Sequence, residues 1–105
     1  MRIVGGSRRG RRLSAPEGRS LRPTSERARE ALFNILGHRD FAPFVLRGSQ
    51  IIDLFAGTGA LGLEALSRGA AHLTAVESDA AALAALRQNI KSLDFDGKVR
   101  VVQGD

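Results

Sequence analysis

Three glycines and two acids near the middle of the chain have the types and spacing of a cofactor-binding loop. Gly57, Gly59 and Gly62 form a G-x-G-x-x-G pattern, and Glu77 follows twenty residues after the first of them. Glycine permits a sharp turn and a close approach of the backbone to a ligand, which a Cβ atom would block. An acid at that separation is placed to accept hydrogen bonds from ribose hydroxyls. The pattern therefore predicts a loop that binds a ribose-containing cofactor.

Asp53, four residues before Gly57, narrows the choice of cofactor. Beside the pyrophosphate of NAD its carboxylate would face charge of its own sign, which is costly. Beside S-adenosylmethionine it would face an ammonium and a sulfonium, both positive. We therefore predict S-adenosylmethionine as the cofactor and keep an NAD-binding oxidoreductase as the alternative. The predicted cofactor-binding residues are Asp53, Phe55, Ala56, Gly57, Thr58, Gly59, Glu77, Ser78 and Asp105.

The acids also have structural interpretations. Asp53 could cap a backbone turn, and Glu77 could be a solvated strand end. For Asp79 we favour a helix cap over a ligand contact, because it precedes a clear helical period. Asp105 follows the last predicted strand, where the amine of an adenine would need an acceptor.

Strand-like and helix-like patterns alternate after residue 50. Short apolar runs indicate buried strands, and apolar residues spaced by three and four indicate helices. Strand, helix, strand, helix, strand is the order of a parallel sheet with right-handed crossovers, so we predict the α/β class with a Rossmann-like domain. The expected elements are a strand over 51–55, a helix over 61–66 ended by Gly69, a strand over 72–76, a helix over 83–93 and a strand over 99–102.

The amino-terminal part has a different organisation. Strand-like pieces at 2–4 and 11–13 flank the glycine-rich stretch 5–10, which predicts a β-hairpin. A helix follows, capped by Thr24 or Ser25 and ended by Gly37 in a left-handed conformation. Its predicted apolar face consists of Ala28, Leu32, Ile35 and Leu36. We expect three parts, a basic hairpin and loop over 1–23, a helix and linker over 24–50, and the cofactor domain over 51–105.

Charge is distributed unevenly along the chain. Residues 1–50 hold eleven arginines and four acids, a net charge of +7, whereas residues 51–105 have a net charge of −2. Clustered arginines favour a polyanionic partner, foremost a nucleic acid. We expect Arg8, Arg9, Arg11 and Arg12 at the hairpin tip to contact phosphates. A solvated basic surface and a small non-enzymatic RNA-binding module are the alternatives.

Composition excludes several classes of protein and site. The chain has no cysteine, and its two histidines, His38 and His72, are far apart, so we expect no metal site. No apolar run approaches the roughly 20 residues needed to cross a bilayer. The first residues do not resemble a secretory signal, so we expect a cytoplasmic protein.

Several segments together resemble the RsmD family of bacterial ribosomal RNA methyltransferases. They are Arg2-Ile-Val-Gly-Gly, Gly10-Arg-Arg-Leu, Leu21-Arg-Pro-Thr-Ser-Glu-Arg-Ala-Arg-Glu-Ala-Leu-Phe-Asn34, Asp53-Leu-Phe-Ala-Gly-Thr-Gly, Leu61-Gly-Leu-Glu-Ala-Leu-Ser-Arg-Gly69 and Val76-Glu-Ser-Asp. The resemblance implies a class I methyltransferase that transfers a methyl group to the exocyclic amine of a guanine in 16S ribosomal RNA. It also implies that Arg22 and Thr24 line the active-site mouth and that the full-length enzyme is a monomer.

One motif of the family is absent from this chain. Such enzymes carry an Asn/Asp-Pro-Pro-Tyr/Phe motif after a fourth strand, and here the three prolines, Pro16, Pro23 and Pro43, are never adjacent. The resemblance therefore implies the amino-terminal part of the enzyme, with the first three strands of a seven-stranded sheet and no catalytic residues. We expect the first strand to be an open edge. We also expect the 105-residue chain to bind cofactor weakly or not at all and not to methylate RNA.

Overall fold

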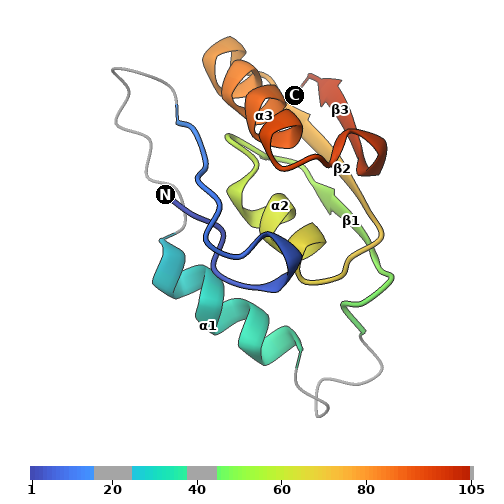
Figure 1. The fold of residues 1–105 in the computed structure, drawn as a ribbon. Helices are drawn as coiled ribbons and strands as arrows, with labels where there is room; N and C mark the ends of the chain where they lie inside the picture. Colours follow the sequence, from blue (N-terminus) through green and yellow to red (C-terminus); the bar gives the residue numbers. More distant parts are fainter. Residues whose placement is uncertain (16–24, 38–44, 105) are drawn as a thin grey trace.

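The computed structural model describes residues 1–15, 25–37 and 45–104, with a three-stranded parallel sheet at their centre. The strands β1 (Gln50–Asp53), β2 (His72–Glu77) and β3 (Val99–Gln103) lie in the order β1-β2-β3. The crossover helices α2 (Ala60–Ser67) and α3 (Ala80–Ser92) lie on the same side of the sheet (Figure 1). The α/β class and the three parallel strands predicted from the sequence are confirmed.

The strand β1 ends at Asp53, two residues earlier than predicted. Leu54 and Phe55 leave the sheet and are exposed, Phe55 at 88% of its surface. The chain then turns toward β2, where the amide of Ala56 donates to the carbonyl of Val76 at 3.0 Å. This early exit raises the glycine loop above the carboxyl ends of β1 and β2.

One face of the sheet forms the main core. Leu73 and Ala75 of β2 are fully buried, as are Leu63 of α2 and Leu86 of α3. The opposite face is more open, and Ile52 of β1 exposes 69% of its surface there. Within the described residues β1 pairs only with β2, so its other edge is open, as expected. Parallel sheets usually bury both faces, which makes this region the least complete part of the fold.

The helix α1 (Glu26–Leu36) begins as predicted but buries a different face. The Ser25 hydroxyl caps it by accepting from the amide of Ala28 at 3.1 Å. The buried residues are Arg29 and Phe33, whereas Leu32 and Ile35 are exposed. The predicted apolar face is therefore only partly correct: Leu36 packs against the core, but Leu32 and Ile35 do not, and a buried carboxylate allows Arg29 to be buried instead. The left-handed cap at Gly37 is also wrong, since its φ is −82°.

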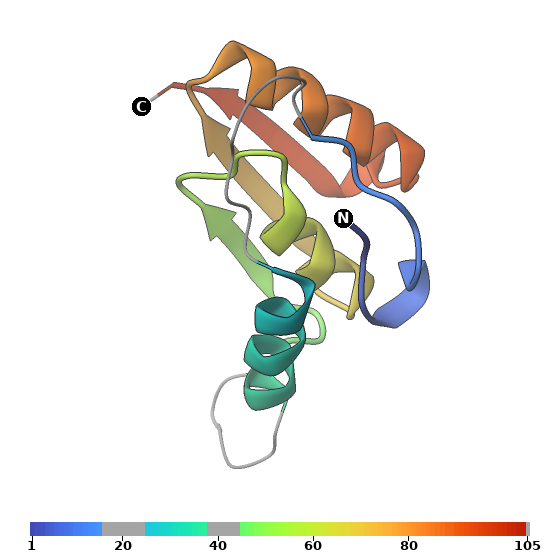
Figure 2. The same cartoon turned by 90° about the vertical axis from the view of Figure 1, so that its left-hand side faces the viewer.

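The amino-terminal hairpin is present in a reduced form. Arg2 and Arg12 form one antiparallel bridge, and a short 3-10 helix, η1 (Gly6–Arg8), makes the tip. The amide of Ile3 donates to the carbonyl of Arg11, and Ile3 is buried. In Figures 1 and 2 this blue segment runs beside α3 and α2 and reaches α1. The hairpin thus packs on the same helices that cover the sheet.

The helix α3 is the crossover between β2 and β3. The Asp79 carboxylate caps it by accepting from the amide of Ala82 at 2.9 Å, which confirms the predicted cap. After α3 the chain turns through Asp94, whose φ is +60°, and through the 3-10 helix η3 (Asp96–Lys98). Among the described residues, no helix has the length and apolar character needed to span a membrane.

Candidate functional site

The glycine loop lies between β1 and α2, at the carboxyl end of the sheet. A turn closes it where the amide of Gly59 donates to the carbonyl of Ala56 at 2.8 Å. The amide of Leu63 then donates to the carbonyl of Gly59, which starts α2. The first amides of a helix lack intrahelical acceptors and point toward the space above the helix start. The loop therefore presents backbone donors at the edge where parallel sheets bind ligands.

The three glycines are needed for different reasons. Gly57 has a φ of +57°, and a Cβ atom added there would meet no atom within 4 Å. Gly59 has a φ of +86°, and its Cβ would lie 2.4 Å from Leu86 Cδ1. Gly62 is in the helix, where a Cβ would lie 2.6 Å from Leu73. Two glycines thus allow close packing, and Gly57 leaves open space beside the loop.

Glu77, at the end of β2, binds the backbone of two segments. Its Oε1 accepts from the amide of Gly57 at 2.7 Å, and its Oε2 accepts from the amides of Ser78 and Asp79 at 3.0 and 2.8 Å. A carboxylate has about four lone-pair sites, so it can accept further hydrogen bonds. Glu77 is therefore not a freely solvated strand end. It orients the glycine loop and retains capacity for a ligand.

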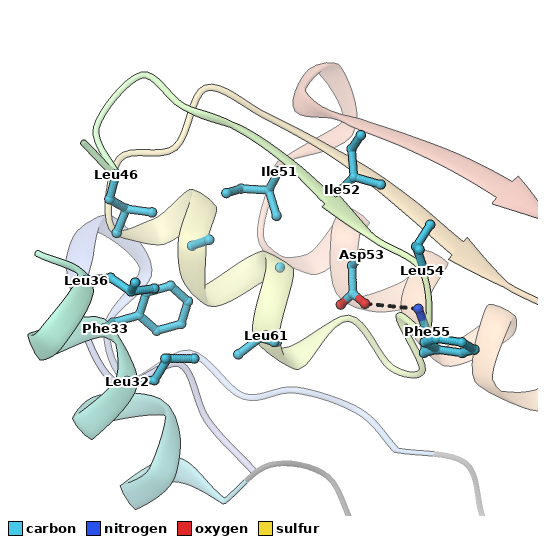
Figure 3. A pocket seen from close by; sticks show the side chains of 12 residues that line it. Leu32, Phe33, Leu36, Leu46, Ile51, Ile52, Asp53, Leu54, Phe55 and Leu61 are labelled. Atoms are coloured by element: carbon cyan, nitrogen blue, oxygen red, sulfur yellow. Dashed lines mark hydrogen bonds between the residues drawn. The ribbon is translucent and has the colours of Figure 1, made fainter. Parts of the chain in front are cut away.

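Asp53 also bonds to the backbone nearby. Its Oδ1 accepts from the amide of Phe55 at 3.1 Å, the local turn that was the structural interpretation of this acid (Figure 3). Asp53 is half-buried at the mouth of the loop. The turn holds the carboxylate at the end of β1, where it can face a positive group. Asp53 can therefore stabilise the local turn and face a positive group of a ligand at the same time.

The remaining predicted cofactor residues differ in what they can offer. The side chains of Ala56 and Thr58 are buried, so only their backbone can reach a ligand. Phe55 and Ser78 are exposed beside the loop. Asp105 lies outside the described residues.

An apolar groove of about 390 Å³ lies on the other side of β1, between α1, α2 and the open strand edge (Figure 3). It shares Asp53 and Phe55 with the predicted cofactor residues, and Gly62 of the glycine pattern also lines it. Neither Gly57 nor Glu77 lines it. The groove therefore adjoins the predicted cofactor site without including its turn at Gly57. Its other lining residues are Leu32, Phe33, Leu36, Leu46, Ile51, Ile52, Leu54, Leu61 and Ala65.

The four arginines of the hairpin divide into two pairs. Arg8 donates from Nε to the carbonyl of Leu93 at 2.6 Å and lies over the ring of Phe95, 4.5 Å from its centre. Arg11 donates to the carbonyl of Ser92 at 2.6 Å. Arg9 and Arg12 are exposed, and Arg11 is exposed as well despite its hydrogen bond. Arg8 and Arg11 thus stabilise the end of α3, where cations complement the helix dipole. Arg22 and Thr24 lie outside the described residues.

A buried cluster around Glu64, consisting of Glu64, Arg29, Arg68 and the amides of Val4 and Gly5, was not predicted. Glu64 is fully buried, and its Oε1 accepts from Arg29 and Val4, while its Oε2 accepts from Arg68 and Gly5, all at 2.9–3.0 Å. Burial lowers the pKa of the Arg29 guanidinium, and the Glu64 carboxylate opposes that shift. The Glu64 cluster joins the hairpin, α1 and α2.

One feature of the sequence was consistent with this cluster. Glu64 stands among apolar residues in the helix predicted over 61–66, and Arg68 follows it by four residues. An i,i+4 pair of opposite charge is usually a surface feature, however, so the pattern alone does not indicate burial.

Comparisons with known proteins agree with this geometry. A family described as "Conserved hypothetical protein 95" matches residues 1–105. "Ribosomal RNA small subunit methyltransferase D" of Escherichia coli K12 is 48% identical over 105 residues, covering all of this chain and 50% of that protein. The protein of the same name from Haemophilus influenzae is 41% identical over 93 residues, covering 89% of this chain and 45% of the relative.

Solved structures of related proteins also superpose on this chain. The structure of the Escherichia coli protein yhhF superposes with a TM-score of 0.81 at 46% identity, covering all of this chain and 52% of that one. The Thermus protein TTHA0928 superposes with a TM-score of 0.77 at 38% identity, covering 99% of this chain and 55% of that one. The chain spans about half the length of the curated relatives it matches. Because the match extends over all 105 residues, this chain belongs to the RsmD family, whose named members are ribosomal RNA methyltransferases.

Proposed function

We propose that this chain is the donor-binding part of an enzyme that transfers a methyl group from S-adenosylmethionine to the exocyclic amine of a guanine in 16S ribosomal RNA. The observation that carries the proposal is the contact between Glu77 and Gly57, which holds the Glu77 carboxylate beside a backbone turn with open space and so supports a role for it in binding ribose. The family membership supports the reaction class. The enzyme would act in the cytoplasm as a monomer.

The charges at the loop fit this cofactor. Asp53 presents a carboxylate to the positive ammonium and sulfonium groups, and the start of α2 presents amides to the cofactor's own carboxylate. S-adenosylmethionine would supply an electrophilic methyl group for transfer to the amine nitrogen, and Asp53, Glu77 and the amides at the start of α2 would hold it. The same loop beside NAD would bring Asp53 against a pyrophosphate.

The hairpin supplies the contact with RNA in this proposal. Arg9 and Arg12 are exposed on a segment that the Glu64 cluster holds against α2. Two exposed guanidinium groups on a segment whose backbone is held in place can contact phosphates, which positions the RNA without reading its sequence. Arg22 and Thr24 would complete the active-site mouth.

Binding of the cofactor can be tested on the chain itself by NMR, which detects weak complexes. Adding S-adenosylmethionine should shift the amide signals of Gly57, Gly59 and Ser78, and NAD should shift them less. Gly57→Ala should abolish the response, because its new methyl group projects into the open space. Gly48→Ala is the matched control, since Gly48 also has a positive φ of +78° and open surroundings. Equal responses to both cofactors would contradict the proposal.

Activity requires more than this chain provides. The 105 residues contain no Asn/Asp-Pro-Pro-Tyr/Phe motif, so we expect no transfer of tritium from labelled S-adenosylmethionine into small-subunit particles. A fusion of residues 1–105 to the carboxyl-terminal half of the Escherichia coli relative should restore transfer. Transfer by the isolated chain would overturn the expectation that the acceptor site lies elsewhere.

A further inference from the structure

The glycine loop and the arginine-bearing hairpin are far apart in the sequence but share one buried side chain, Asn89 of α3. Its Nδ2 donates to the carbonyl of Thr58 at 2.9 Å and to the carbonyl of Ser14 at 3.0 Å. Its Oδ1 accepts from the amide of Ser14 at 2.6 Å. Asn89 is fully buried. One amide group therefore bonds to both segments.

The chemistry of this position requires a carboxamide. Both hydrogens of Nδ2 and the Oδ1 acceptor are used, and each faces a backbone group of the opposite kind. An aspartate would place a carboxylate against two carbonyl oxygens, and an alanine would leave the buried polar groups of Ser14 and Thr58 without these partners. A movement of the Thr58 carbonyl thus changes the bonds that hold Ser14.

Ser14 continues directly from the part of the hairpin that carries the exposed arginines. Leu13 is buried, and its amide donates to the carbonyl of Met1 at 2.9 Å. Arg12 forms the bridge to Arg2. The bonds from Asn89 to Ser14 therefore hold the second arm of the hairpin two residues from Arg12.

We propose that Asn89 is a positioning residue that couples the donor-binding loop to the RNA-binding hairpin. Occupation of the loop stabilises the placement of the Thr58 carbonyl, and through Asn89 it stabilises the hairpin arm that presents Arg12. Coupling of this kind is reciprocal, so RNA on the hairpin tightens the binding of the donor. The functional meaning of the coupling rests on the proposed function, whereas the coupling itself does not.

The first experiment needs no ligand and measures amide hydrogen exchange on the chain. Leu13→Ala loosens the hairpin arm, and we expect the Gly59 amide to exchange about tenfold faster, the effect of weakening one or two buried hydrogen bonds. In an Asn89→Ala background, Leu13→Ala should add no further increase. The Ala71 amide, which donates to the carbonyl of Ser49 at 2.7 Å, serves as the reference for loosening in a part of the domain away from the hairpin.

Equal acceleration of Gly59 by Leu13→Ala in both backgrounds would overturn the proposal, as would no acceleration at all while Ala71 stays protected. If either variant fails to fold, the milder pair Leu13→Val and Asn89→Ser replaces it and is judged by the same comparison. Gln88→Ala is the matched control, because Gln88 is the exposed neighbour of Asn89 on α3. It should leave the response of Gly59 as in the native chain.

The second experiment adds S-adenosylmethionine and follows the Ser14 amide. In the native chain and in Gln88→Ala, the cofactor should slow exchange at Ser14 as well as at Gly59. In Asn89→Ala any slowing should stay within the loop. Slowing at Ser14 that survives Asn89→Ala would overturn the proposal. If no amide responds to the cofactor, either in the chain or in its fusion to the carboxyl-terminal half of the Escherichia coli relative, the proposed function fails, and the ligand-free experiment still decides the coupling.

Discussion

Replacing Glu64 by glutamine should destabilise the protein far more than any surface change of the same charge. The Glu64 carboxylate is fully buried and accepts four hydrogen bonds, two from amides and two from guanidinium groups. Glutamine keeps one oxygen and replaces the other by an NH₂ group. Each carboxylate oxygen accepts from two donors, so in either orientation of the glutamine amide two of the four donors would face its NH₂ group instead of an acceptor.

The magnitude follows from the bonds that are lost. A hydrogen bond to a charged group contributes about 1.5–3 kcal/mol, so losing two of them costs about 3–6 kcal/mol of unfolding free energy. That range overlaps the cost of about 3–5 kcal/mol for removing one partner of a buried ion pair. In a domain of this size each kcal/mol lowers Tm by about 4–8 °C. We therefore expect Tm to fall by more than about 12 °C.

Thermal unfolding followed by circular dichroism measures this effect, with Glu30→Gln as the control. Glu30 is exposed on α1, so the same change of charge there should cost no more than about 0.5 kcal/mol. Adding Arg29→Met to Glu64→Gln removes the uncompensated buried charge and should recover part of the loss. Recovery should be incomplete, because the amides of Val4 and Gly5 still lack a full acceptor set. If Glu64→Gln and Glu30→Gln lower Tm equally, the Glu64 cluster does not join the hairpin to the domain.

Three further predictions concern the loop and the hairpin. Gly59→Ala should lower the unfolding free energy by about 2–4 kcal/mol in urea, from the 2.4 Å approach to Leu86 plus the positive φ, whereas Gly48→Ala should lose only the backbone part, about 1 kcal/mol. Equal losses would mean that Leu86 moves aside freely. Arg9→Ala with Arg12→Ala, in a protein that binds rRNA, should reduce the slope of log K against log[salt] by about 1.4–1.8 without changing Tm. Arg8→Ala should lower Tm because Arg8 bonds to Leu93 and packs on Phe95. An unchanged Tm would mean that these contacts do not stabilise the fold and that Arg8 is better explained as a phosphate contact, as predicted from the sequence.

Local patterns predicted much of the fold and of the candidate loop. The alternation of apolar runs and helical periods led to the three strands and the two crossover helices. The caps at Ser25 and Asp79 could be predicted because a cap depends on the few residues that follow it. The position of Glu77 at the end of the second strand could be predicted as well, whereas its hydrogen bond to the Gly57 amide was not. These features depend on neighbours in the chain, so the sequence contains them directly.

The buried polar groups depended on the tertiary structure. Arg29 and Glu64 look like surface residues, and each can be buried only because the other is present from a different helix. Arg8 and Arg11 look like RNA ligands, yet they bond to carbonyls at the end of α3, more than eighty residues away. Asn89 joins two segments that no local pattern relates. By itself the sequence determined the elements and the loop, whereas the partners of buried polar groups were decided by tertiary packing, because pairing there depends on distance in space.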